Sequence, residues 1–436
     1  MGDLLDEAKD WLSIPSISAG ARDEESLRHA AAWAIQRVRR AGGSAEMVAT
    51  PGGAPLVVGE LRSAKKNAPT VMIYGHYDVQ DPGDLELWDS PPFEPTIRDE
   101  RLYARGATDD KGNFLPLLFV ACELAKAGAL PVHIRVLIEG AEETGSDDVG
   151  DWVRADTRGA DAVIVFDSGM VDADRPALTL ATRGMVFAHL EVRTGTQTAH
   201  SGMYGGAALN AFHALHAILA AVLPGPDGKL PEPLRAGVKA PSPAEIDSWA
   251  TLPTGETELA GVGARPSDAT AAEEFYVRTT AEPSLDVHRV HGGEARTIVV
   301  PVATADLSVR LVGDQRSEVI AANLEGLLRD ALPDGAELTI STDRAEPSAF
   351  DPALPALQAA VRALERSTGV APALIRSGGT LPVLAAFSER GIPAIVSGFS
   401  LPDDNLHAPN ESFRLVALDQ GAAAARALYE ELAKLR

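Results

Sequence analysis

The chain has 436 residues, of which 45% are hydrophobic and 23% charged, the composition of a globular protein with room for two domains. The formal net charge is −23, and no run of Lys or Arg exceeds two residues. Because a nucleic-acid binder needs a basic face to displace counterions from phosphate, nucleic acid and anionic membranes are not expected as partners. With one cysteine, the chain can form neither an intrachain disulfide nor a thiolate zinc site.

The sequence also predicts the cellular location of the protein. Its first residues, MGDLLDEAKD, are acidic where a secretory signal peptide begins with basic residues. The apolar stretch AFHALHAILAAVL contains two histidines and is shorter than the roughly 20 apolar residues that a bilayer span needs. We therefore expect a cytoplasmic protein that has no membrane partner.

In chain order, the first 45 residues have helical patterning that ends at Gly42 and Gly43. Helical stretches then follow at 112–127 and 147–156. Short apolar runs rich in β-branched residues predict buried strands at 70–74, 132–138, 162–166 and 394–397. Buried strands that alternate with helices favour an α/β fold, in which a mostly parallel sheet has helices on both faces.

The middle of the chain has a different pattern. Apolar and polar residues alternate at 184–194, 297–312 and 337–343, as they do in half-exposed antiparallel strands. Helical runs at about 207–222 and 315–332 lie among these strands, and 224–280 is rich in Pro, Gly and Thr. We predict an α+β domain inserted into an outer α/β domain. The boundaries are 1–181 and 348–436 for the outer domain and 182–347 for the inserted one.

Candidate metal ligands lie near the ends of predicted strands, where open parallel sheets bind ligands. His76 and Asp78 belong to TVMIYGHYD. Strand residues i and i+2 share a face, so Asp78 can hold the second ring nitrogen of His76. Asp109 lies in LYARGATDDKGN, before an apolar helix. A carboxylate there can bridge two metal ions, or it can cap the helix.

Two further predicted strands end in carboxylates, and a loop near the C-terminus adds a histidine. In VLIEGAEETGS, Glu142 and Glu143 would repel each other unless cations lay nearby. This pair suggests one metal ligand and one general base, with two solvated loop charges as an equal alternative. Asp167 follows the strand in AVIVFDSG, and His407 lies in the loop after the 394–397 strand.

Together, His76, Asp109, Glu143, Asp167 and His407 supply two imidazoles and three carboxylates. With Asp109 shared, each of two divalent ions would have one histidine, one terminal carboxylate and an open position for water. These donors suit zinc and also accept manganese or cobalt. Two metal ions about 3.5–4 Å apart can generate a bridging hydroxide and polarise a carbonyl, which predicts a hydrolase.

The motifs H-Y-D-V, R-G-A-T-D-D-K-G, E-G-A-E-E-T-G-S and L-H-A-P-N-E together resemble those of one enzyme family. This co-catalytic dinuclear zinc peptidase family includes carnosinase, cytosolic nonspecific dipeptidase, glutamate carboxypeptidase, acetylornithine deacetylase and succinyl-diaminopimelate desuccinylase. The resemblance runs from about residue 4 to 436, and Asp at position 167 favours the dipeptidase and carnosinase branch. It implies metal-dependent hydrolysis of an amide bond in dipeptides or similar small substrates with a free carboxylate. It also implies a homodimer with a catalytic outer domain and an inserted lid and dimerisation domain.

The resemblance implies roles for the residues of the outer domain. His76 and Asp167 would bind one metal ion, with Asp109 bridging to the second. Glu143 and His407 would bind that second ion. The general base would be Glu142, which would pass the proton of the attacking water to the leaving amine, and Asp78 would orient His76.

The resemblance also implies roles for residues of the inserted domain and of RSGGTLPV. His200 would reach the site of the partner subunit and stabilise the oxyanion, although by residue type it could be a helix cap. Thr297 and Arg310 would contact the substrate, with Arg310 binding its C-terminal carboxylate, although Arg310 also fits a plain surface charge. Gly379 and Thr380 lie where the family has a Gly-Ser pair that would contact the substrate. The hydroxyl of Thr380 can make the same hydrogen bonds as the serine hydroxyl.

The sequence is also compatible with other functions. An N-acyl- or N-carbamoyl-amino-acid amidohydrolase, of the deacylase or desuccinylase type, would use the same two metal ions and Glu142. A metallo-phosphoesterase would need more histidines and a phosphate cradle, and the chain has no G-x-x-x-x-G-K-[ST] loop. A serine hydrolase would need G-x-S-x-G, which GFSLP does not provide. The non-enzyme alternative is a metal-free binding protein, which the complete ligand set and Glu142 oppose.

Overall fold

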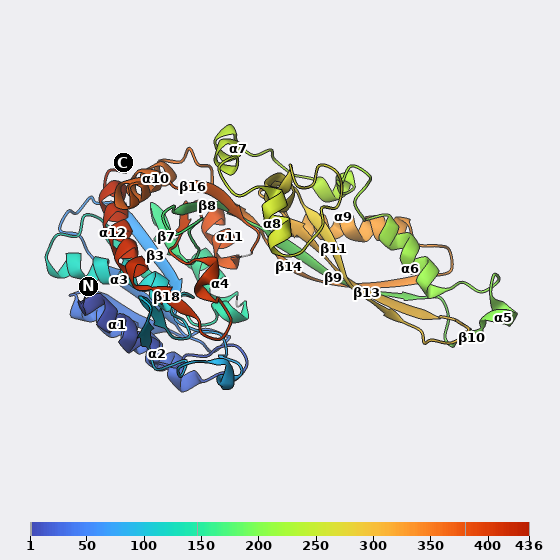
Figure 1. Cartoon of the computed structure of the whole chain (residues 1–436), viewed down its shortest axis with the longest axis horizontal. Coiled ribbons are helices and arrows are strands. Elements are labelled where there is room, and N and C mark those ends of the chain that lie inside the picture. Colours follow the sequence, from blue (N-terminus) through green and yellow to red (C-terminus); the bar gives the residue numbers. More distant parts are fainter. Residues whose placement is uncertain (1, 146, 380, 436) are drawn as a thin grey trace. The chain divides into compact units, whose positions relative to one another are not determined.

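The structure is a computed structural model that describes residues 2–145, 147–379 and 381–435. The chain divides into two compact units (Figure 1). The first comprises the described residues of Met1–Leu180, Phe350–Ile375 and Val383–Arg436, and the second those of Ala181–Ala349 and Arg376–Pro382. Among the described helices, none is long and apolar enough to cross a membrane.

A large mixed sheet forms the centre of the first unit. Its strands in spatial order are β1 (Ser44–Val48), β2 (Leu56–Leu61), β6 (His133–Glu139), β3 (Thr70–His76), β7 (Ala162–Phe166), β17 (Ala394–Ser397), β8 (Ala177–Thr182) and β15 (Ser348–Ala349). β16 (Ala373–Ser377) pairs with β8. The central strands β6, β3, β7 and β17 pair in parallel, and the strands towards both edges pair antiparallel. The parallel strands are the four apolar runs that the sequence predicts.

Helices cover both faces of this sheet. They are α1 (Gly2–Leu12), α2 (Glu24–Arg40), α3 (Lys111–Lys126), α4 (Asp148–Ala155), α10 (Pro355–Thr368), α11 (Pro382–Glu389) and α12 (Leu415–Leu432). Tyr74 of β3 packs edge-on against Phe387 of α11, with ring centroids 6.0 Å apart. The next residue is Gly75, where an added Cβ would lie 2.4 Å from the ring of Phe114 in α3. Because successive strand residues point to opposite faces, α11 and α3 lie on opposite faces of the sheet. The predicted α/β fold, with parallel strands at the centre of the sheet and helices on both faces, is confirmed.

A small antiparallel sheet connects distant parts of the first unit. It contains β18 (Ser412–Arg414), β5 (Arg101–Tyr103) and β4 (Thr96–Arg98). β18 pairs with β5 in a register that sets Phe413 opposite Leu102. This pairing, which the sequence did not predict, brings the loop that carries His407 beside the segment that leads to Asp109.

The second unit contains a four-stranded antiparallel sheet. Its strands in spatial order are β11 (Ser284–Gly292), β13 (Val302–Leu311), β9 (Gly184–Arg193) and β14 (Glu337–Ala345). Helices α6 (Ala211–Ala220) and α9 (Ser317–Asp330) pack against the sheet, and β9 alternates between buried and half-buried residues along its length. This alternation is the pattern from which we predicted antiparallel strands.

One predicted strand of the second unit differs from the sequence-based expectation. The run 297–312 divides into β12 (Ile298–Val299), which pairs with β10 (Ala199–His200), and β13, with Pro301 between them. Pro has no N–H to donate to a ladder, which explains the break. The Pro- and Gly-rich stretch 224–280 contains short helical turns, including α7 (Pro243–Trp249) and α8 (Gly255–Gly261).

By their contacts, the described residues of Arg376–Pro382 belong with the second unit, whereas we predicted all of 348–436 in the outer domain. Arg376 Nε donates a 2.7 Å hydrogen bond to Glu245, at the start of α7. The carbonyl of Gly379 accepts a 3.0 Å hydrogen bond from the N–H of Arg183. These are contacts between positions far apart in sequence, which no local pattern reveals.

Candidate metal centre

The five candidate ligands of the first unit lie near the carboxyl ends of its parallel strands. His76 is the last residue of β3, Glu143 follows β6, and Asp167 directly follows β7. Asp109 lies just before α3, and His407 lies in the loop between β17 and β18. Strands β6, β3 and β7 are neighbours, so the order of the strands brings residues together that are far apart in sequence.

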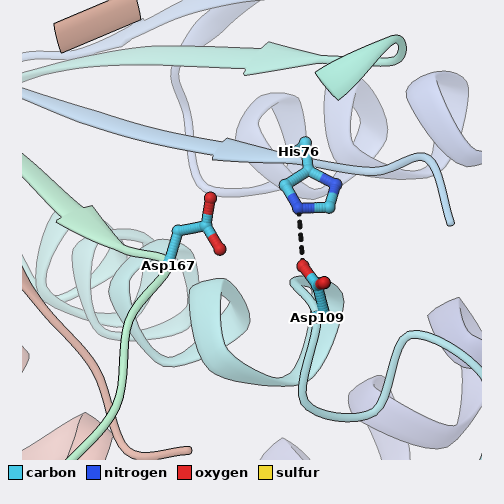
Figure 2. Close-up of side chains that lie close together, drawn as sticks. All are labelled: His76, Asp109 and Asp167. Atoms are coloured by element: carbon cyan, nitrogen blue, oxygen red, sulfur yellow. Dashed lines mark hydrogen bonds and ion pairs between the residues drawn. The ribbon is translucent and has the colours of Figure 1, made fainter. Parts of the chain in front are cut away.

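The five residues form two groups that share Asp109. One group contains His76, Asp109 and Asp167, and the other contains Asp109, Glu143 and His407. In each group, one ligand atom from every residue lies within 4.8 Å of the others. Figure 2 shows the first group, in which Asp109 faces the His76 ring and the Asp167 carboxylate lies beside them.

Each oxygen of Asp109 faces a different histidine. Oδ1 lies 2.9 Å from Nε2 of His76, and Oδ2 lies 2.8 Å from Nε2 of His407. The same nitrogen of His407 lies 3.1 Å from Oε2 of Glu143. A carboxylate whose two oxygens face two different imidazoles is placed to bridge two cations, one beside each histidine.

Asp78 lies against both His76 and the segment that carries the two adjacent glutamates. Nδ1 of His76 lies 3.1 Å from the Asp78 carbonyl oxygen and 3.4 Å from its carboxylate oxygen Oδ1. The carboxylate also accepts hydrogen bonds from the N–H groups of Glu142 (3.3 Å) and Glu143 (3.2 Å), and from the hydroxyl of Ser18 (2.6 Å). Asp78 therefore fixes the His76 ring and the backbone after β6 at the same time.

The carboxylates of the site are crowded and short of positive charge. Burial raises the pKa of Glu142 to about 9 and that of Asp167 to about 7, with Asp109 adding to both shifts and His76 opposing them. Burial also disfavours the charge on Asp109, but hydrogen bonds from His407 and His76 hold its pKa below its usual range. Two divalent cations would supply the missing charge, and the donor set of two imidazoles and three carboxylates fits them.

The loop that carries His407 has an unusual backbone. His407 has a φ of 58°, and Asn405 and Asn410 have φ values of 57° and 61°. This left-handed region is uncommon for residues other than glycine, and such conformations persist only where the surroundings enforce them. The Asn410 side chain accepts a hydrogen bond from Asp89 N–H (2.9 Å) and donates one to the Leu87 carbonyl (3.0 Å). The loop is thereby held in the shape that turns His407 towards Asp109.

The sequence did not identify Asn113 as part of the site. Its side chain donates hydrogen bonds to the Ser168 carbonyl and the Ser400 hydroxyl, both at 3.1 Å, and accepts one from Phe399 N–H at 3.0 Å. Asn113 therefore connects α3 to the loop after Asp167 and to the end of β17. One signal was available, because Asn113 is a polar residue directly before the apolar run FLPLLFVA of α3.

The remaining predicted site residues belong to the second unit. His200 is exposed, and its Nδ1 accepts a hydrogen bond from Gly202 N–H, which is a helix-cap contact. Thr297 is also exposed, and its carbonyl accepts a hydrogen bond from Ser201 N–H, so His200 and Thr297 share one corner of this unit.

Arg310 and Gly379 are both close to Arg183. Burial and the neighbouring charge of Arg310 lower the pKa of Arg183 to about 10. Arg310 itself is half-buried in β13, and Gly379 accepts the hydrogen bond from Arg183 N–H noted above. Thr380 lies outside the described residues.

Known proteins share both the sequence pattern and the fold. Residues 72–431 match Peptidase family M20/M25/M40. The chain is 28% identical to the Cysteinylglycine-S-conjugate dipeptidase of Corynebacterium striatum, over 94% of this chain and 91% of that protein. It is 26% identical to the Beta-Ala-His dipeptidase of Homo sapiens, over 99% of this chain and 90% of that protein.

The fold is similar to solved structures over the whole chain. The M20 family metallo-carboxypeptidase Sso-CP2 from Sulfolobus solfataricus superimposes with a TM-score of 0.85 and 26% identity, covering 100% of both chains. Human carnosine dipeptidase 1 superimposes with a TM-score of 0.73 and 26% identity, covering 100% of this chain and 96% of that one. As the motif resemblance predicted, the chain belongs to Peptidase family M20/M25/M40.

Proposed function

We propose that this chain is a dipeptidase that uses two divalent metal ions to hydrolyse the peptide bond of small substrates with a free carboxylate. The observation that carries the proposal is the position of Asp109, because each of its two carboxylate oxygens faces a different histidine. Asp109 belongs to both ligand groups, and each group contains one further carboxylate, that of Asp167 or that of Glu143. The relatives named above as dipeptidases, which the chain covers almost completely, support the substrate class.

His76, Asp109 and Asp167 would hold one metal ion, and Glu143 and His407 would hold the other together with Asp109. Bound there, two ions would lower the pKa of the attacking water and polarise the scissile carbonyl. Zinc is the metal that we propose, because imidazole and carboxylate donors suit it, with manganese or cobalt as replacements.

Glu142 would move the proton in this reaction. It follows β6 at the same strand end as Glu143, belongs to neither ligand group, and is held through its N–H by Asp78. Its carboxylate oxygen would take a proton from the attacking water and donate it to the leaving amine. Burial raises its pKa to about 9 in the protein alone, and neighbouring cations would lower this value towards the neutral range in which a general base works best.

The second unit would supply substrate contacts. Arg310 is half-buried beside Arg183, and within the described part of the chain no hydrogen bond or ion pair engages its guanidinium. A guanidinium in that situation is suited to the C-terminal carboxylate of a peptide. Thr297, Gly379 and Thr380 would contact the substrate, and His200 would stabilise the oxyanion in the site of a partner subunit. A homodimer, a lid role for the second unit and a cytoplasmic location belong to the same proposal.

A second candidate function is that of a carboxypeptidase, because one solved structure of similar fold, Sso-CP2, is named a metallo-carboxypeptidase. We would separate the two with one panel of substrates, assayed on EDTA-treated protein before and after zinc or manganese is added. The panel contains free dipeptides, longer peptides, and N-acetyl, N-succinyl and N-carbamoyl amino acids. We expect metal-restored cleavage of free dipeptides. Faster release of C-terminal residues from longer peptides would favour the carboxypeptidase, and cleavage of acylated amino acids alone would favour the amidohydrolase alternative.

A further inference from the structure

Glu411, the last residue of the L-H-A-P-N-E motif, is completely buried, and each of its carboxylate oxygens accepts two hydrogen bonds. Oε1 accepts from the N–H groups of Thr108 (2.9 Å) and Asp109 (3.2 Å). Oε2 accepts from Gly106 N–H (3.0 Å) and from Nη1 of Arg105 (2.7 Å). Three of the four donors are therefore backbone groups of the segment that delivers Asp109.

The main chain of Glu411 holds the same segment. Its carbonyl accepts a 3.1 Å hydrogen bond from Ala104 N–H, and the residues that follow it form β18, which pairs with β5. His407 lies four residues before Glu411 on the same loop. Glu411 is thus the position at which the segments carrying Asp109 and His407 are joined.

We propose that Glu411 is a positioning residue that sets the place of the Asp109 carboxylate relative to His407, and so the geometry of the bridged metal pair. This inference deepens the proposed function and rests on it. The bond to the N–H of Asp109 is the most direct part of the argument, because any shift of that backbone moves the carboxylate itself. Metal–ligand distances in well-formed sites lie within about ±0.2 Å of their preferred values, so we expect a small shift of the carboxylate to weaken metal binding.

Another buried glutamate provides a matched comparison. Glu431 of α12 is 6% exposed and pairs with the side chains of Arg362, Arg366 and Lys434. The Glu431 carboxylate has three partners and that of Glu411 has four, but the partners of Glu431 are the basic side chains of Arg362 and Arg366 in α10 and of Lys434, not the backbone of a candidate ligand. Loss of Glu431 therefore tests what the loss of a buried, paired glutamate does by itself.

Glu411→Gln tests these hydrogen bonds directly, because the four donors are divided equally between the two carboxylate oxygens. Whichever way the new amide is turned, its NH₂ group meets two N–H donors and can accept from neither. One orientation loses the bonds to Thr108 and Asp109, and the other loses those to Gly106 and Arg105. Glu411→Asp keeps the charge and both oxygens but withdraws them by one methylene, so a smaller change is expected.

The test is a cobalt titration of the EDTA-treated full chain and of the E411Q, E411D and E431Q variants. It follows the visible spectrum of bound Co²⁺, and affinity is measured by competition with a chelator. Thermal unfolding of the metal-free proteins is recorded in parallel. We expect E411Q to bind Co²⁺ about 10- to 100-fold more weakly with an altered spectrum, and E411D to show a smaller change in the same direction. E431Q should keep the affinity and the spectrum even if its melting temperature falls.

Unchanged affinity and spectrum in folded E411Q would overturn the role of Glu411, and so would an equal change in E431Q. If E411Q does not fold, the spectrum of E411D decides in the same way. Failure of the unsubstituted chain to bind Co²⁺ at all would overturn the proposed two-metal function together with this inference, which separates it from a failure of Glu411 alone.

Discussion

Replacing Glu142 with Gln is expected to lower kcat for dipeptide hydrolysis by about 100- to 10,000-fold while both metal ions remain bound. Gln has nearly the same shape as Glu but cannot take a proton from water and return it to the leaving amine. Metal binding should survive because Glu142 belongs to neither ligand group, and its N–H bond to Asp78 does not depend on the side chain. The measurement is kcat on a free dipeptide, with the metal content of the same sample determined in parallel.

The control for this prediction is Glu123→Gln. Glu123 is a half-exposed glutamate near the end of α3 that pairs with Arg37 and Lys126, so its loss should leave kcat unchanged. A kcat of E142Q close to that of the unsubstituted protein would remove Glu142 from the role of general base. A loss of kcat that accompanies loss of metal would instead indicate that Glu142 is a ligand.

The second large effect is expected for Asp109→Asn, which should bind fewer than two metal ions per chain and lose hydrolysis. Asn keeps one acceptor oxygen, but its NH₂ group has no lone pair for a metal ion, so it cannot bridge. The NH₂ group would also face the nitrogen of either His76 or His407, where Asp109 now offers an oxygen. Metal content after dialysis, together with the rate on a dipeptide, measures the effect.

Asp156→Asn is a matched control for the loss of a largely buried aspartate. Asp156 pairs with Arg135 and Arg158, and its side chain is 9% exposed, compared with 11% for Asp109. We expect D156N to retain two metal ions and activity even if its thermal stability falls. Two firmly bound ions in D109N would show that Asp109 does not bridge.

The sequence predicted the central strands because β3, β6, β7 and β17 lie inside a sheet covered on both faces, where nearly every residue must be apolar. It missed β2 and β8. The run LVVGEL of β2 is interrupted by Gly59, and the run ALTLAT of β8 mixes Ala and Thr with only two leucines. The pairing of β18 with β5 joins residues about 310 positions apart, and no periodicity in either short segment indicates it.

The candidate ligands could be proposed from the sequence because His, Asp and Glu are recognisable as possible metal ligands from the residue type alone. What the sequence could not provide was the geometry, in which Asp109 turns one oxygen to each histidine. The contribution of Glu411 was hidden for a related reason. Three of its four donors are backbone N–H groups, which every residue except proline has, so no sequence pattern marks them.

The measurement that tests the account most directly is a titration of EDTA-treated protein with zinc, in which hydrolysis of a free dipeptide is followed against the number of metal ions bound per chain. We predict no hydrolysis without metal and a rate that rises until two ions are bound and then levels off. A full rate in the metal-free protein would contradict metal-dependent hydrolysis. A plateau at one ion per chain would contradict the bridged two-metal centre at Asp109.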